Sequence, residues 1–163
     1  MNKLATASIL ALTLIATTAS AQAVRTEKNM SLELASQIAS ATVAACTANG
    51  YAVTATVVDR AGTVRAVMRA DNAGAHTLGA SQQKAWTSAS AKNTTLAMME
   101  GAQKNPAAAN LVNIPGFLLL GGGVPVKVGN ETIGAVGVGG APGGHLDEAC
   151  AVAALDKVKD QLK

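Results

Sequence analysis

The fold is decided by two glycine-rich segments, Gly121-Gly122-Gly123-Val124-Pro125-Val126 and Gly134-Ala135-Val136-Gly137-Val138-Gly139-Gly140-Ala141-Pro142-Gly143-Gly144-His145-Leu146-Asp147-Glu148-Ala149-Cys150. Valine-rich runs between the glycines predict strands over residues 124–128 and 132–138, joined through Gly129-Asn130 as a hairpin. The Gly/Pro loop that follows leads into an Ala-rich helix predicted over 146–162. This part of the chain therefore predicts a hairpin that runs directly into the last helix.

The N-terminal half predicts a helix followed by a second hairpin. Ser31 is a suitable N-cap, Glu33 complements the helix dipole in the first turn, and Asn49-Gly50 ends the helix. The Val- and Thr-rich segments at 53–59 and 63–69 predict two strands.

The middle of the chain predicts mainly helix. A loop at 70–75 precedes a helix over 77–93, a short helix ends near Gly101, another spans 107–112, and a fifth strand is predicted at 117–120. The order of helix, two strands, helices, three strands and helix predicts an α+β domain with a five-stranded, mostly antiparallel sheet.

The N-terminal segment has the features of a secretory signal peptide. Lys3 precedes an apolar run over residues 4–16, and small residues around Ala21 and Ala23 fit a signal-peptidase site. The run is short for a membrane span, although an anchor left uncleaved is the alternative. We expect a signal peptide at 1–23, a single domain at 24–163, and a periplasmic or secreted protein without a stable membrane span.

Composition excludes a nucleic-acid partner and predicts an aliphatic core. Removing Lys3 from the 13 basic residues leaves 12 against 10 acidic residues, a net charge of about +2, with scattered arginines. Aromatic residues make up only 2% of the chain, so Ala, Val, Leu and Ile must fill the core. Small side chains bury little area each, at about 25 cal/mol per Å², which favours self-association.

Four further segments occur in order before the C-terminal stretch: Ser31-Leu32-Glu33-Leu34-Ala35, Val57-Val58-Asp59-Arg60-Ala61-Gly62, Arg69-Ala70-Asp71-Asn72-Ala73-Gly74-Ala75-His76-Thr77 and Lys84-Ala85-Trp86-Thr87. Over residues 30–163 they resemble the GlcG/HbpS family of small heme-binding and related proteins, which also includes the C-terminal domain of PduO. The resemblance implies a profilin-like three-layer arrangement, closed homo-oligomers, and heme or a related tetrapyrrole as the ligand.

Cys46 and Cys150 are the only cysteines. An oxidising compartment permits a disulfide between them, and two free buried thiols are the alternative. The resemblance favours pairing, because in this family's fold the terminal helices share one face of the sheet.

Candidate ligand-binding residues gather around the predicted start of the middle helix. Imidazole is a common axial ligand of heme iron, and the resemblance makes His76 the iron ligand, with a surface or capping histidine as the alternative. Arg69 and Lys84 would face the propionates, or else are solvated charges. Trp86 would stack on a flat ligand, or else anchors the core.

His145 is the second candidate metal ligand. It lies beside Asp147 and Glu148, but successive residues on a helix point in different directions, so helix capping is the preferred role. The glycines at 137, 139 and 143 do not have dinucleotide-loop spacing, and no βαβ unit surrounds them. These glycines predict a tight structural turn, with a weak cation site as the alternative.

No catalytic constellation is recognisable in the sequence. We therefore expect an exported small-ligand-binding protein that binds heme as a homo-oligomer, and lean against an enzyme. The alternative, implied by the GlcG relatives, is an enzyme acting on a small hydroxy acid, with His76, Lys84 and the glycine loops at its site.

Overall fold

The computed structural model describes residues 23–163 and contains one four-stranded antiparallel sheet. The strands are β1 (Thr54–Asp59), β2 (Val64–Arg69), β3 (Gly123–Val128) and β4 (Glu131–Gly139), in the spatial order β2-β1-β4-β3. The predicted signal segment, apart from Ala23, lies outside the described residues. Both predicted hairpins are present, and β1 and β4 pair in the centre.

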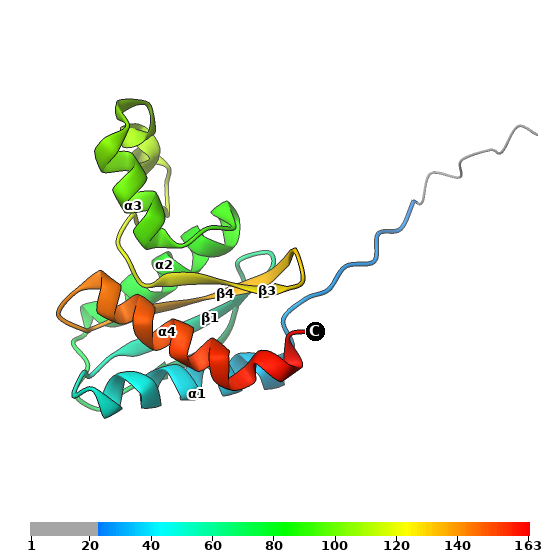
Figure 1. Cartoon of the computed structure of the whole chain (residues 1–163), viewed down its shortest axis with the longest axis horizontal. Coiled ribbons are helices and arrows are strands. Elements are labelled where there is room, and N and C mark those ends of the chain that lie inside the picture. The colour runs from blue at the N-terminus through cyan, green and yellow to red at the C-terminus, as the bar shows by residue number, and fades with distance from the viewer. Residues whose placement is uncertain (1–22) are drawn as a thin grey trace, which may run out of the picture.

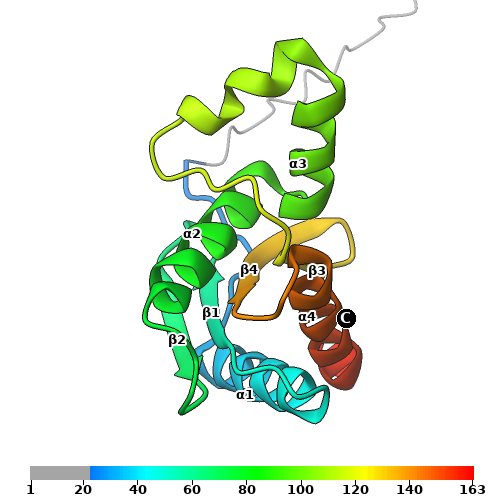
Figure 2. The ribbon, with the colours of Figure 1, turned by 90° about the vertical axis from the view of Figure 1, so that its left-hand side faces the viewer.

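Helices cover both faces of this sheet (Figures 1 and 2). The first and last helices, α1 (Leu32–Ala48) and α4 (Gly144–Val158), pack side by side on one face, and α2 (His76–Ala91) packs on the other. A short 3-10 turn, η2 (Lys159–Gln161), follows α4. The predicted α+β class and three-layer arrangement are therefore confirmed.

The segment between α2 and β3 extends away from the sheet. It contains α3 (Thr95–Lys104) and the 3-10 helix η1 (Pro106–Asn113), and Figure 1 shows α3 standing clear of the layers. Thr94 caps α3 by accepting a hydrogen bond from the Ala97 N–H. Thr95 is the only buried residue of α3, and none of η1 is buried.

The predicted fifth strand at 117–120 is wrong. The Leu118 N–H donates to Thr87 Oγ1 at 2.9 Å, and the Leu120 carbonyl accepts from Thr95 Oγ1 at 2.7 Å. Because side chains of α2 and α3 satisfy these backbone groups, the segment is an extended connection and the sheet has four strands.

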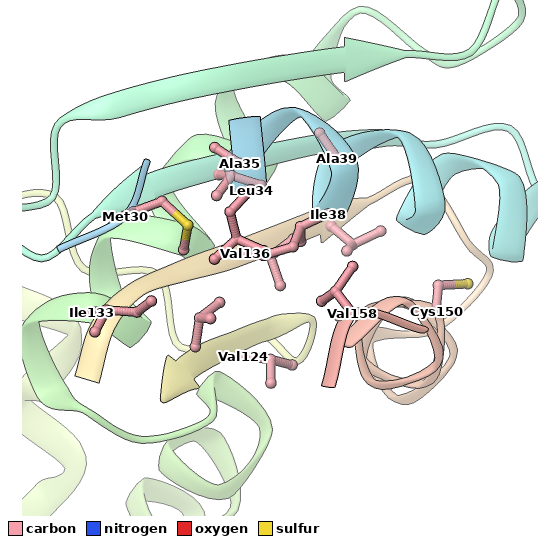
Figure 3. Close-up of a cluster of buried hydrophobic side chains, with 14 of the residues drawn as sticks. Met30, Leu34, Ala35, Ile38, Ala39, Val124, Ile133, Val136, Cys150 and Val158 are labelled. Atoms are coloured by element: carbon pink, nitrogen blue, oxygen red, sulfur yellow. The ribbon is translucent and has the colours of Figure 1, made fainter. Parts of the chain in front are cut away.

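The main core lies between the sheet and the α1/α4 layer (Figure 3). Ser31 caps α1 through the Leu34 N–H, and the apolar face of α1 then contacts the inward residues of β4 and α4. The core is aliphatic, as composition predicts; its side chains include Met30, Leu34, Ile38, Val124, Ile133, Val136 and Val158.

Cys46 and Cys150 form a disulfide that joins α1 to α4. Both residues are buried in the same core. The predicted pairing is confirmed, and the disulfide links two cysteines that are 104 residues apart in the sequence. Among residues 23–163, we find no helix with both the length and the apolar character that a membrane crossing requires.

Candidate functional site

A buried ion pair connects α2 to α4 at one end of the sheet. The ammonium nitrogen of Lys84 lies 2.9 Å from Asp147 Oδ2 and 2.8 Å from the Val138 carbonyl oxygen. The two charged side chains are only 2% and 4% exposed. Buried charges are costly unless they are paired and hydrogen-bonded, so each side chain fixes the position of the other. The pair thereby joins helices from opposite faces of the sheet.

The glycines at 121–123 provide the space that this pair occupies. A Cβ on Gly122 would lie 2.7 Å from Asp147 Cβ and 3.1 Å from Lys84 Nζ. A Cβ on Gly123 would overlap the backbone carbonyl oxygen of Lys84. Gly122 and Gly123 are therefore required where the chain passes between α2 and α4, because a side chain at either position would displace the ion pair or α2.

The ion pair lines a pocket of about 220 Å³. His76, the first residue of α2, contributes an exposed imidazole to the same pocket, and residues 139–144, between β4 and α4, contribute much of the rest. This pocket is therefore lined by an imidazole, a buried ammonium and a buried carboxylate. Of the predicted site residues, His76 and Lys84 meet here.

Asp147 has a second partner in the loop that lines the pocket. Its Oδ1 accepts a hydrogen bond from the Ala141 N–H at 3.0 Å. Burial raises the pKa of Asp147 above its ordinary value, while the hydrogen bond and charge of Lys84 and the Ala141 N–H oppose this rise. An ammonium has three donors, and the two bonds of Lys84 leave one N–H for a ligand.

Glu148 is a partly buried carboxyl, which the sequence indicates only as an acidic residue in the first turn of the last helix. Its Oε2 is the only buried side-chain oxygen or nitrogen in the described residues that lacks a hydrogen-bond partner. Burial raises the pKa of Glu148; Thr94 and the N–H groups of Leu96 and Gly122 oppose the rise, and the charge of Glu100 adds to it. No local sequence signal marks this burial, because α3 and the glycine triplet supply the cover.

Arg69 and Trp86 lie outside this pocket. The Arg69 guanidinium donates to the Ala73 carbonyl in the loop before α2. Trp86 is ten residues from His76 on α2, about 15 Å along the helix axis. It contacts Phe117 edge to face, with ring centroids 5.6 Å apart, and lines a separate pocket of about 300 Å³ with Gly79, Gln82, Gln83 and Gly116.

His145 is exposed in the first turn of α4 and does not cap the helix. The N-cap is Gly143, and no side chain makes a capping hydrogen bond there, so the predicted capping role is wrong. A glycine at this position lets the loop turn into the helix without a side-chain oxygen. Within residues 23–163, no group of three metal-binding side chains gathers around His145 or elsewhere.

Most of the chain matches a known protein family. Residues 30–156 match the family described as haem degrading protein HbpS-like. The chain belongs to the HbpS-like family. The match includes α1, the whole sheet, α2 and nearly all of α4, so both sides of the pocket lie within the family domain. No curated protein matches the chain.

Solved structures support the same assignment. HbpS of Streptomyces reticuli, in a double-mutant form, is 31% identical, with 95% of this chain and 99% of that chain covered and a TM-score of 0.79. Protein ORFY of Klebsiella pneumoniae is also 31% identical, covering 83% and 94% with a TM-score of 0.76. The PduOC:heme complex is 22% identical, covering 74% and 88% with a TM-score of 0.66, which shows a shared fold.

Proposed function

We propose that this HbpS-like protein binds heme, with His76 as the iron ligand. The observation that carries the proposal is the exposed imidazole of His76 at the pocket that also contains Lys84 and Asp147. His145, the other of the chain's two histidines, is not part of this pocket. The HbpS-like family assignment and the fold shared with PduOC, whose complex contains heme, point to the same ligand.

The residues present fit a heme. The imidazole of His76 would hold the heme iron, and the bound heme would supply redox and ligand-exchange chemistry. Lys84 in the pocket and the exposed Arg69 outside it are the cations that could pair with propionate groups. Leu120, which is 43% exposed and lines the pocket, offers an apolar contact to the macrocycle.

The pocket volume supports the homo-oligomeric part of the proposal. About 220 Å³ is below the roughly 300–1,000 Å³ of pockets that enclose drug-sized ligands. One chain therefore encloses only an edge of a tetrapyrrole. We propose that a second copy of the chain covers the rest, and that residues 1–23 direct export of the chain and are then removed.

Hemin titration of the mature protein tests the binding proposal. A saturable shift of the Soret band supports it, whereas linear, non-saturating absorbance overturns it. His76→Ala should weaken binding and shift the absorption bands, and the matched His145→Ala should leave the bound spectrum unchanged. Spectra that respond to His145 and ignore His76 would reverse the ligand assignment. Because the family is described as haem degrading, decay of the Soret band with ascorbate in air would add that activity.

The proposed oligomeric state and the proposed export are tested separately. Light scattering with and without hemin should give a mass several times that of the chain. Protein recovered from the periplasm or the medium should begin at Gln22 or Val24. A chain that starts at Met1 and remains with the membrane fraction would overturn the proposed export.

One observation supports a second candidate function. The small pocket combines His76, Lys84 and Asp147, which is an acid/base set of a size that suits a small hydroxy acid. Calorimetric titration with glycolate tests this alternative. The enzyme would be favoured if the wild type binds glycolate saturably and does not bind hemin. His76→Ala and Lys84→Met should then both abolish the glycolate binding.

A further inference from the structure

We infer that Asp147 is a positioning residue, which holds the pocket loop at residues 140–143 in place beside His76 and thereby sets the affinity for the ligand. The inference rests on the proposed heme binding, and assigns Asp147 a role in it without contact to iron. Its basis is the hydrogen bond from the Ala141 N–H to Asp147 Oδ1.

The loop receives side-chain hydrogen bonds from a single residue in the described part of the chain. Its residues are Gly140, Ala141, Pro142 and Gly143, and among the described residues Asp147 is the only side chain that hydrogen-bonds to it. Gly140 has a φ of +134°, which an L side chain rarely adopts. Pro142 has no N–H to donate. Gly140 also lies against the backbone of Ala52 and Val53, and Ala141 packs against the main core. Asp147 thus supplies the one side-chain hydrogen bond that fixes the loop at Ala141.

Asp147 is itself held in place by α2 and by the chain that leads into β3. Lys84 fixes its Oδ2 at 2.9 Å, and the backbone of Gly122 closes against its Cβ. Lys84 is in turn fixed by the Val138 carbonyl, at the end of β4. The Asp147 carboxylate is therefore fixed relative to β4 and α2, and its hydrogen bond to Ala141 holds the loop in a fixed position relative to both.

The loop shares the pocket with His76, so its position defines the space next to the imidazole. An outer partner that orients a binding site commonly changes metal affinity by about 10–100-fold when it is lost. Release of the loop from Asp147 should therefore weaken ligand binding even though no ligand contact has been removed. A purely structural role would lower stability and leave the affinity of the folded protein unchanged.

Two double variants isolate this hydrogen bond. Lys84→Met/Asp147→Asn and Lys84→Met/Asp147→Leu both remove the buried charges, and replacing a buried ion pair with groups of similar volume is often tolerated. They differ in one respect, since the asparagine side chain retains an oxygen for the Ala141 N–H and the leucine side chain does not. Any direct contact between Lys84 and a propionate is absent from both, so it cancels in the comparison.

The Leu variant should bind hemin about tenfold more weakly than the Asn variant, with a shifted Soret band. In the hemin-free proteins, the Ala141 amide proton should exchange faster in the Leu variant. Asp147→Asn and Asp147→Leu alone form a second pair with the same expected order, should either double variant fail to fold.

Equal affinities and equal spectra within either folded pair would overturn the inference while leaving heme binding intact. Equal exchange rates at Ala141 would overturn it as well, because the loop would then not depend on Asp147. Wild-type protein that fails to bind hemin would overturn the proposed function, and the inference would fall with it.

Discussion

The hydroxyl oxygens of Thr56 and Ser81 lie 2.8 Å apart in the buried interface between β1 and α2. One turn earlier on α2, Thr77 pairs with Thr54 at 2.7 Å. The helix therefore meets the sheet through short polar side chains that satisfy one another. Because these side chains are small, the helix can lie close to the sheet. Large aromatic side chains, which make up only 2% of the chain, are not needed to fill the interface.

Ser81→Ala should lower the free energy of unfolding by about 1–3 kcal/mol, because it leaves the Thr56 hydroxyl buried without a partner. Thr56→Val/Ser81→Ala removes both hydroxyls and should cost less than the sum of the two single changes. Urea denaturation of the four proteins measures this coupling. Strictly additive losses would show that the two hydroxyls do not stabilise the interface together.

Much of the fold could be predicted because its signals are local. Glycine-bounded, valine-rich runs indicated the two hairpins, and the strands begin and end within a residue or two of the predicted positions. The segment at 117–120 carries a similar local signal but does not form a strand. Its backbone groups instead bond to the side chains of Thr87 and Thr95. These residues lie 31 and 25 positions away in the sequence, so no local pattern could predict the hydrogen bonds.

The candidate site was predictable only in part, for the same reason. His76 and Lys84 lie close together in the sequence, and the structure places both at one pocket. Asp147, however, is 63 residues from Lys84, and from the sequence it is only an acidic residue in a first helical turn. Its role arises only because α2 and α4, from opposite faces of the sheet, come together at one end of the sheet, and the local sequence does not encode that tertiary contact.

Gly137 and Gly79 should respond to alanine in opposite directions. A Cβ on Gly137 would overlap the Ser81 carbonyl oxygen beneath α2, so Gly137→Ala should cost about 1–3 kcal/mol or more as the helix is pushed from the sheet. Gly79 lies on the open side of the same helix with nothing within 4 Å. Gly79→Ala should stabilise by about 0.5–1 kcal/mol. Thermal and urea unfolding would contradict the close packing if both changes were neutral.

Loss of the disulfide should destabilise the chain strongly. Cys46 and Cys150 are 104 residues apart, and in the chain-entropy model a loop of about 100 residues corresponds to a contribution of up to about 4–5 kcal/mol. Cys46→Ala/Cys150→Ala should therefore unfold at much lower urea concentration than the oxidised protein. Reductant should destabilise the wild type and leave the double variant unaffected. Thiols that titrate freely in denaturant without reductant would contradict the bond.

Glu148 should make stability depend on pH. Burial raises its pKa in the folded chain, so the folded state holds this proton more tightly than the unfolded state does. The stabilisation is complete below the unfolded pKa and is lost as the pH rises through the folded pKa. Glu148→Gln keeps the position neutral at every pH. As the pH rises above 4.5, the ordinary pKa of this carboxyl, the free energy of unfolding of Glu148→Gln should therefore increase relative to that of the wild type.

Asp147 has a raised pKa as well, but it is present in both proteins and its contribution largely cancels in their difference. Asp156→Asn is the matched control, because it neutralises an exposed carboxylate on the same helix and leaves Glu148 in place. Urea unfolding at several pH values gives the three curves. A constant offset between Glu148→Gln and the wild type would mean that Glu148 binds its proton equally in the folded and unfolded chains. The buried Oε2 would then have a partner, such as an ordered water, that offsets the cost of its burial.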